Sequence, residues 1–414
     1  MTHPFRARRL LPTAVAALIG VSYCFASDLT ASGARGQNVS PSLVSLHPQN
    51  LPPHRSVGNS VAMDLDTAIV GAPGDSSGTG AAYVFTRALT GEWRQQAQLT
   101  SADATSGDEF GASVAVASET ALVGTGVSDS PAAYVFVRHG STWTPEARLD
   151  VGRGVMSVAL SSSGDRAVVG VSGAVNPTIE AAYVFARGPG KWVQEAVLAP
   201  NPGTPPGSGF GYAVSISDNV VAIGAQGENS SNGAVYIFER DAGGTWRRQV
   251  RLALVSTDHS PAMFGWSVGL AGRTLMVGAF GENDFRGAAY IFQQTQAGLW
   301  SQQARLVPDA RSPGYQCFGF AVGLTLYGAL IGQPCDGEGG GLSTRVYVFS
   351  RGTSGAWARR VAVSSPAAAD TANFGAALAT NGLDVVIGSP SENPAGAAYV
   401  LECLPCLLYG GERP

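Results

Sequence analysis

Acidic residues recur at one position of the sequence pattern, and carboxylates are side chains that bind cations or act as general acids and bases. An apolar segment containing glycine occurs seven times, and in five copies an acid stands four positions after that glycine. These acids are Asp75, Glu228, Glu282, Asp336 and Glu392. Because the five acids share one register, we predict that their carboxylates lie on one face of the molecule. There they could form a negatively charged binding rim or a weak cation site. We favour the alternative that each carboxylate accepts hydrogen bonds from backbone amides of a turn.

Cysteines are the second group with possible chemistry. Four of them follow the N-terminal apolar segment: Cys317, Cys335, Cys403 and Cys406. Cys317 and Cys335 flank a predicted hairpin whose turn lies midway between them, so we predict a disulfide across it. Cys403 and Cys406 have neither the second cysteine pair nor the neighbouring histidine of a zinc site, and no βαβ context for redox chemistry. We predict a small structural disulfide there.

Other catalytic candidates are few. The histidines beyond the N-terminal segment are His47, His54, His139 and His259, which do not share a register. The sequence contains no Gly-x-Ser-x-Gly, no His-Glu-x-x-His and no phosphate-binding loop. We therefore predict no catalytic residue. An enzyme stays an alternative, because propellers also serve as scaffolds for hydrolases and lyases.

The elements that must position these side chains belong to an internal repeat. Close copies of Gly-Ala-Ala-Tyr-Val-Phe (287–292) align on seven tyrosines: Tyr83, Tyr134, Tyr183, Tyr236, Tyr290, Tyr347 and Tyr399. A tryptophan follows each of the first six tyrosines after nine or ten residues. A period of about fifty residues is typical of solenoids and propellers.

Each repeat is predicted to form four short strands, which we name A to D. Strand A follows Phe-Gly, as at 110–116, and strand B ends in Gly-Ala-Pro or a relative, as at 68–73. Strand C contains the tyrosine, and strand D begins at the tryptophan. Residues of alternating polarity favour strands over helices. Seven units of four antiparallel strands predict an all-β, seven-bladed β-propeller, with glycines at close backbone contacts and aromatic residues between blades.

Phe-Gly followed by Gly-Ala-Pro, once per unit, resembles the FG-GAP repeat. That repeat builds the seven-bladed propeller at the head of integrin α chains and of many secreted bacterial proteins. The resemblance covers about residues 40–402. Two units depart from it: the first retains only Gly58 of its Phe-Gly pair, and the third has Arg-Gly-Val-Met-Ser-Val from position 153. Both retain strands B, C and D, so the predicted number of blades stays seven.

The resemblance also implies calcium sites, which integrin-type propellers carry in long A-to-B turns with the pattern Asp-x-Asp-x-Asp-Gly-x-x-Asp. In this chain the corresponding turns are short, as in Ala-Ser-Glu-Thr (117–120) and Ile-Ser-Asp-Asn (216–219). Such turns leave no room for a cage of oxygen ligands. We predict no cofactor, and calcium stays an open alternative for the acidic residues.

Closure of the ring requires one strand from the N-terminal side, because the seventh unit ends without a tryptophan or a strand D. Leu46 stands eleven residues before Val57, the same spacing that separates strand D of the first unit from strand A of the second. We predict that residues 42–47 pair with the strand at 396–402. This pairing removes two exposed sheet edges.

The N-terminus predicts export. Arg6, Arg8 and Arg9 precede an apolar run that ends near Ala26, as in a secretory signal. That run is shorter than the ~20 residues of a membrane-spanning helix, although a retained anchor is the alternative. The predicted organisation is a signal peptide (1–26), a flexible segment (27–39), the propeller (40–402) and a C-terminal tail (403–414).

Charge and composition limit the partners. A net charge of -4 provides no basic face for nucleic acid. No second apolar segment is long enough to span a membrane, and we expect a secreted or cell-envelope monomer. We predict a binding module whose loop face engages an extracellular protein or glycan. The alternatives are a carbohydrate-active hydrolase or lyase and a structural component of the envelope or matrix, because a fold alone does not establish function.

Overall fold

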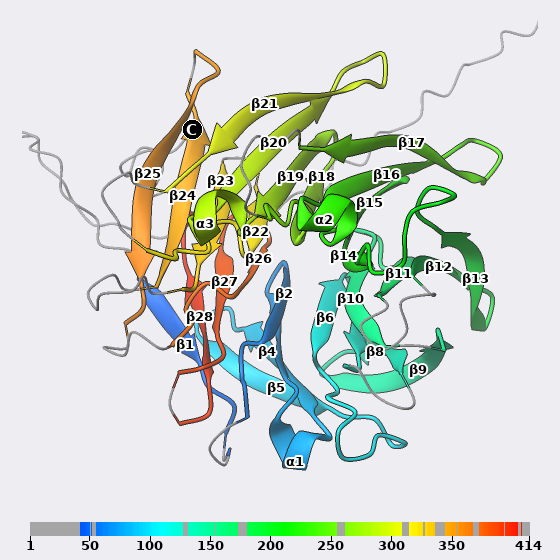
Figure 1. Ribbon diagram of the computed structural model, residues 1–414. Helices are drawn as coiled ribbons and strands as arrows, with labels where there is room; N and C mark the ends of the chain where they lie inside the picture. The colour runs from blue at the N-terminus through cyan, green and yellow to red at the C-terminus, as the bar shows by residue number, and fades with distance from the viewer. Residues whose placement is uncertain are drawn as a thin grey trace, which may run out of the picture. The chain divides into compact units, whose positions relative to one another are not determined.

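The computed structural model (Figure 1) describes residues 42–407 with internal gaps. The gaps are position 50 and residues 52–54, 127–130, 153, 173–179, 255–260, 309–313, 326–327, 336–343, 353, 367–371, 393 and 405–406. The predictions for segments 1–26 and 27–39, for Asp336 and for Cys406 therefore lie outside the described residues. None of the described helices has the length and apolar character required to cross a bilayer.

Four-stranded sheets form the first four blades, each in the order A to D. Blade 1 contains β2 (Ser60–Asp64), β3 (Thr67–Ala72), β4 (Ala81–Arg87) and β5 (Trp93–Leu99). Blade 2 contains β6 (Ser113–Ala117), β7 (Thr120–Gly124), β8 (Ala132–His139) and β9 (Thr142–Asp150). Blade 3 contains β10 (Val155–Leu160), β11 (Arg166–Val171), β12 (Ala181–Gly188) and β13 (Lys191–Leu198). Blade 4 contains β14 (Phe210–Ser217), β15 (Val220–Ala225), β16 (Ala234–Arg240) and β17 (Trp246–Ala253).

The last three blades repeat this pattern. Blade 5 contains β18 (Ser267–Ala271), β19 (Thr274–Ala279), β20 (Ala288–Gln294) and β21 (Trp300–Leu306). Blade 6 contains β22 (Val322–Leu324), β23 (Ala329–Gln333), β24 (Arg345–Arg351) and β25 (Trp357–Ser364). Blade 7 contains β26 (Ala377–Thr380), β27 (Val385–Ser389), β28 (Ala397–Leu401) and β1 (Leu43–Leu46). The predicted all-β propeller with seven four-stranded blades is confirmed.

Strand β1 is the outer strand of blade 7, as predicted. It runs antiparallel to β28, with Leu43 opposite Leu401 and Leu46 opposite Ala398, and Figure 1 shows the two strands side by side. A second contact also joins the two ends of the propeller: Nη1 of Arg87 in blade 1 donates a hydrogen bond of 2.8 Å to Asp384 of blade 7. The ring is therefore closed by backbone pairing and by a charged side-chain pair.

The repeated glycines lie where neighbouring blades touch. A Cβ atom added to Gly278 of β19 would lie 1.9 Å from the carbonyl oxygen of Gly319, which follows Phe318 in the next blade. Equivalent contacts of 1.9–2.1 Å occur in five other pairs: Gly71 with Gly111, Gly170 with Gly211, Gly224 with Gly265, Gly332 with Gly375 and Gly388 with Gly58. No side chain fits at this distance, so the Gly-Ala-Pro glycine of one blade and the Phe-Gly glycine of the next are needed together. Gly58 keeps this contact although its unit lacks the phenylalanine.

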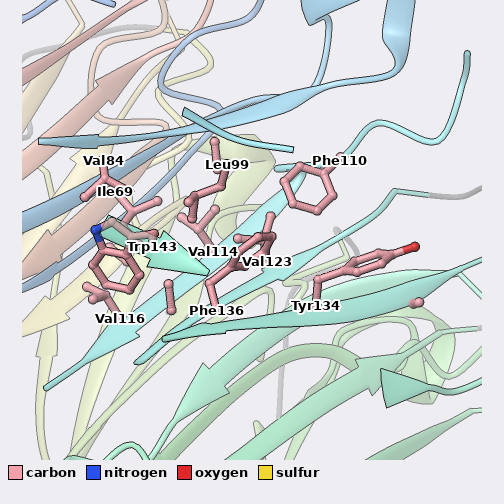
Figure 2. Packing of buried hydrophobic residues seen from close by; sticks show 14 residues of the cluster. Ile69, Val84, Leu99, Phe110, Val114, Val116, Val123, Tyr134, Phe136 and Trp143 are labelled. Carbon is pink, nitrogen blue, oxygen red and sulfur yellow. The ribbon is translucent and has the colours of Figure 1, made fainter. Parts of the chain in front are cut away.

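The buried core lies between neighbouring blades. Figure 2 shows Ile69, Val84 and Leu99 of blade 1 in one cluster with residues of blade 2. The ring of Phe110, which is fully buried, lies 5.5 Å from that of Tyr134 and 6.2 Å from that of Phe136. The same tilted or edge-on packing recurs at Phe210, Phe264, Phe318 and Phe374. Aromatic pairs in this geometry contribute energy beyond the burial of their area, which explains the repeated Phe-Gly and Tyr-Val-Phe segments.

Blade 6 carries a disulfide. Cys317 and Cys335 are bonded across the hairpin of β22 and β23, which confirms the predicted pairing. For the other predicted pair, Cys406 lies outside the described residues, so the bond to Cys403 stays a prediction.

Candidate functional site

The acidic series begins the short turns that connect strands B and C. Three of these turns are α1 (Asp75–Gly78), α2 (Glu228–Ser231) and α3 (Glu282–Phe285) in blades 1, 4 and 5. Their central residues are left-handed: Asn229 has φ 53° and Ser230 has φ 56°. In Figure 1 the three turns lie on the same face of the propeller. This face, formed by the B-to-C and D-to-A loops, is called the loop face below.

Each left-handed turn is attached to the next blade. The backbone carbonyl of Ser231 accepts a hydrogen bond of 2.8 Å from the amide of Met263, and that of Asn232 accepts one of 3.1 Å from Phe264. The turns of blades 1 and 5 are bound to Phe110 and Phe318 in the same way. A left-handed conformation is costly for residues other than glycine and persists only when surrounding contacts impose it. These backbone bonds are such contacts, so exposed side chains such as Asn229 are presented on a fixed backbone.

The carboxylates of the series are bonded within their own blades. The hydroxyl of Tyr236 donates to Glu228 at 2.9 Å, and that of Tyr290 donates to Glu282 at 2.6 Å. Tyr83 donates to Asp75 and Tyr399 to Glu392 in the same manner. Burial, followed by the hydrogen bond to the carboxylate, raises the pKa of Tyr83, Tyr290 and Tyr399. We call these pairs the acid–tyrosine latches.

Arginines complete two of the latches. Nη2 of Arg251 lies 2.6 Å from Oε1 of Glu228, and Nη2 of Arg305 lies 2.5 Å from Oε1 of Glu282. Glu228 is buried and Glu282 is partly buried. Their carboxylates use their hydrogen-bonding capacity on the blade itself, which supports a structural role. At Asp75 the amide of Ser76 also donates, at 2.7 Å, the kind of bond that the sequence predicted.

The tyrosine and arginine partners were missed by the sequence analysis, although a signal for them exists. Acid and tyrosine are separated by eight residues in blades 1, 4 and 5 and by seven in blade 7. Acid and arginine are separated by 23 residues in blades 4 and 5. These fixed spacings place all three side chains at one end of the blade.

A chain of aromatic side chains lies on the loop face of blades 4 to 6. We define the aromatic patch as Tyr212, Trp266, Phe280, Phe285, Tyr315 and Phe320. Trp266 is its centre: its ring lies 4.6 Å from that of Tyr212, 4.5 Å from that of Phe280 and 5.3 Å from that of Phe320. Phe285 of α3 joins Phe280 to Tyr315, whose side chain is 48% exposed. Tyr212, Trp266 and Phe320 are partly exposed, so the patch is open to solvent.

Three of these aromatic residues occupy the position directly after Phe-Gly. Blades 1, 2 and 7 have Asn59, Ala112 and Ala376 at that position. An aromatic side chain at this position is therefore not required for the blades to form a closed propeller. The repeated aromatic residues were predicted to pack between blades. The position after Phe-Gly distinguishes the partly exposed aromatic residues of the patch from those buried residues.

Two polar groups of the patch are unused. Among the described residues, neither the Tyr212 hydroxyl nor the Trp266 indole N–H has a hydrogen-bond partner. Neither is a fully buried atom, in contrast to the indole N–H groups of Trp93, Trp246 and Trp300. Burial raises the pKa of Tyr212 to about 12, so the hydroxyl keeps its proton and can donate at neutral pH. Buried tyrosine and tryptophan usually pair their polar ends, and these two are available to a ligand.

The inner strands line an open, shallow pocket of about 200 Å³. Most of the residues that line it have apolar side chains, including Val61, Met63, Val116, Leu160 and Ile216. None of the lining residues that the structure describes is titratable. Within the described ranges, no three His, Cys, Asp or Glu side chains are grouped so as to hold a metal ion. The arrangement offers an aromatic surface and hydrogen-bond donors rather than an acid–base pair.

Comparison with known families identifies the repeat. The FG-GAP repeat model matches residues 52–85, 93–136, 192–238 and 246–292. The chain carries FG-GAP repeats. Three of the four matches begin at the tryptophan of strand D and end in strand C of the next blade. One FG-GAP unit therefore spans the boundary between two blades, where the glycine pairs meet.

Solved structures share the propeller fold of this chain at low sequence identity. Hydrazine synthase of Kuenenia stuttgartiensis aligns with a TM-score of 0.56 and 13% identity over 90% of this chain and 99% of that chain. A protein from Lactobacillus plantarum aligns with a TM-score of 0.55 and 13% identity over 82% and 93%, respectively. The RRP9 WD40 repeats align with a TM-score of 0.56 and 10% identity over 87% and 98%. These similarities concern the fold alone. No curated protein sequence matches the chain.

Proposed function

We propose that this FG-GAP propeller is an exported binding module that engages an extracellular protein or a glycan through its loop face. The observation that carries the proposal is the aromatic patch, which is partly exposed and occupies a position where other blades have asparagine or alanine. Clustered exposed aromatic residues on a rigid scaffold are typical of recognition surfaces. The FG-GAP repeats and the propeller fold are consistent with an interaction module.

Two observations are compatible with an extracellular location. The Cys317–Cys335 disulfide would persist in an oxidising compartment, and the described residues include no helix that could span a membrane. The basic and apolar N-terminal segment supports export through a cleaved signal. Cleavage after Ala26 is tested by N-terminal sequencing of the protein recovered from the medium of the producing cells.

Binding is tested by a glycan and extracellular-protein array, probed with the mature chain in calcium and in chelator. Three proteins are compared: the natural chain, Trp266→Ala and Leu89→Ala, which removes an exposed leucine from the hairpin between β4 and β5. We expect the natural chain and Leu89→Ala to bind the same partners and Trp266→Ala to lose them. Equal binding by Trp266→Ala, or silence of all three proteins, would overturn the proposal. Loss of binding in chelator alone would instead assign a cation role to the acidic series.

A further inference from the structure

We propose that the ligand of the aromatic patch is a neutral carbohydrate, whose sugar rings pack on the exposed aromatic surfaces and whose hydroxyl groups bond to Tyr212 and Trp266. This inference rests on the proposed function and adds the chemical class of the ligand. Its support comes from three features of the patch: the order of the rings, the unused donors and the charges around them.

The rings form a continuous path. Tyr212, Trp266 and Phe320 stand at equivalent positions of three consecutive blades, with ring centroids separated by 4.6 and 5.3 Å along the path. Phe280 packs beneath this path and is buried, so it supports the partly exposed rings. The ring planes are tilted by 40° between Tyr212 and Trp266 and by 52° between Trp266 and Phe320, so the series follows the curve of the propeller. Such a series of apolar faces suits an oligosaccharide, because the C–H groups of successive sugar rings present apolar faces of similar size. The strands of the blades fix the distances between the aromatic rings, so binding requires little additional ordering of these side chains.

The unused donors match hydroxyl groups. The Tyr212 hydroxyl can donate and accept, and the Trp266 indole N–H can donate only. Other tyrosine hydroxyls of the propeller, including Tyr236 and Tyr290, are bonded to a carboxylate of their own blade. A sugar hydroxyl can serve as acceptor to either group and as donor to Tyr212. Ligand pockets commonly combine apolar walls with a few such polar groups.

Four charged residues near the patch in the described part of the chain already have partners. Glu228 and Glu282 are held in latches by tyrosine and arginine. Asp284 and Arg286 of the α3 region are also engaged in interactions. A cationic or anionic ligand would have to compete for these groups, whereas a neutral ligand leaves them paired. We therefore favour a neutral carbohydrate over an acidic polysaccharide and over a charged peptide.

The test is isothermal titration of the mature chain with neutral hexasaccharides (cellohexaose, xylohexaose, maltohexaose and N-acetylchitohexaose) and with an oligogalacturonate as the acidic comparison. Trp266→Ala, Tyr212→Phe and Trp266→Phe are compared with Leu299→Ala, which removes an exposed leucine from the same blade as Trp266. Circular dichroism and thermal unfolding establish that each variant is folded. Tyr212→Phe keeps the ring and removes one hydroxyl, so it tests the contact even where Trp266→Ala does not fold.

We expect at least one neutral hexasaccharide to bind. Trp266→Ala should weaken that binding by at least about tenfold, and Tyr212→Phe and Trp266→Phe should each weaken it by about fivefold through the loss of one hydrogen bond. Leu299→Ala should bind as the natural chain does. The affinity should change less than about twofold between low and high salt, since no exposed charge pair is involved.

The outcomes distinguish the proposal of a neutral carbohydrate ligand from the proposal of a binding module. Binding of the oligogalacturonate alone, or unchanged affinity in both Trp266 variants, overturns the neutral-carbohydrate assignment. If the hexasaccharides fail but the array shows a protein partner that Trp266→Ala loses, the ligand class is wrong and the binding module stands. If neither carbohydrate nor protein binds, both proposals fail.

Discussion

Two groups of blades share the backbone conformation around the Phe-Gly position and differ in the residue that follows its glycine. The residue before the phenylalanine or its equivalent is left-handed in both groups, with φ of 54° at Ser56 in blade 1 and 53° at Met263 in blade 5. In both groups the glycine of the Phe-Gly position contacts the Gly-Ala-Pro glycine of the preceding blade. The following residue is Asn59, Ala112 or Ala376 in blades 1, 2 and 7, and aromatic in blades 4 to 6. The glycines are set by contact between blades, whereas the position after them is free to carry a ligand-binding side chain.

The largest effect is expected at a glycine of the ring contact. Gly278→Ala places a Cβ atom 1.9 Å from a backbone oxygen of blade 6, whereas Gly269→Ala in the same blade meets only ordinary contacts, the nearest at 3.7 Å. Gly278→Ala should lower the free energy of unfolding by at least about 3 kcal/mol because two blades must separate. Gly269→Ala should cost less than about 1 kcal/mol. Urea unfolding midpoints measure the difference, and equal midpoints would contradict the packing account.

Ring closure should depend on Asp384. This buried aspartate accepts hydrogen bonds from Arg87 at 2.8 Å and from the amide of Cys403 at 2.9 Å. Asp384→Ala removes the buried acceptor of both hydrogen bonds, leaves Arg87 with the longer 4.0 Å contact to Glu402, and should destabilise the fold by about 3 kcal/mol. Glu92→Ala is the control, because its pair with Arg94 is exposed and should contribute less than about 1 kcal/mol. Thermal unfolding compares the two, and similar losses would show that closure does not depend on this pair.

The hydroxyl groups of two tyrosines in blade 4 should behave differently. Tyr236→Phe removes the hydrogen bond to buried Glu228 and should cost about 1–2 kcal/mol of unfolding free energy. Tyr212→Phe removes a hydroxyl without a partner among the described residues, so the stability should change by less than about 0.5 kcal/mol. Chemical unfolding of both variants tests the distinction. A large loss in Tyr212→Phe would place that residue in the framework rather than in the binding surface.

A further effect is confined to alkaline pH. Burial raises the pKa of Tyr212 to about 12, whereas the unfolded chain ionises near pH 10. Between these values the folded state binds the extra proton, so its stability is complete below pH 10 and decreases as the pH rises towards 12. Tyr212→Phe should make this decrease shallower, and Tyr315→Phe at the half-exposed end of the patch provides the comparison. Unfolding midpoints measured from pH 9 to 12 test this, and identical slopes would contradict it.

Much of the fold could be predicted because its determinants repeat. The Phe-Gly and Gly-Ala-Pro glycines, the tyrosines and the tryptophans recur at fixed spacings, since every blade faces the same packing problem. Strand β1 and the Cys317–Cys335 disulfide also followed from spacing, because pairing register depends on the number of intervening residues. The deviations in blades 1 and 3 did not change the architecture. In blade 3 the side chain of Val155 packs against Gly124 at the position of the missing Phe-Gly contact.

The candidate site was less predictable for two physical reasons. The latch partners lie 8 and 23 residues from the acids, on strands C and D, so their meeting depends on the register of the sheet. Trp266 and Phe264 are both aromatic and nearly adjacent, yet Phe264 is fully buried and Trp266 is partly exposed. The two residues precede β18 in a turn where Gly265 has φ 93° and the Trp266 amide donates a 3.1 Å hydrogen bond to Met263, so strand alternation does not distinguish them. Only the contacts across blades show that Trp266 belongs to a continuous surface.

The Arg87–Asp384 pair joins residues that are 297 positions apart. At 5–20 residues per second, the ribosome needs roughly 15 to 60 s to make the intervening chain. Throughout that interval the flank of blade 1 that will face blade 7 has no partner. A product truncated before blade 7 keeps this apolar flank exposed and is therefore a target for proteases and aggregation. Closure thus makes the stability of the first blade depend on the last, because only a chain that includes blade 7 covers this flank.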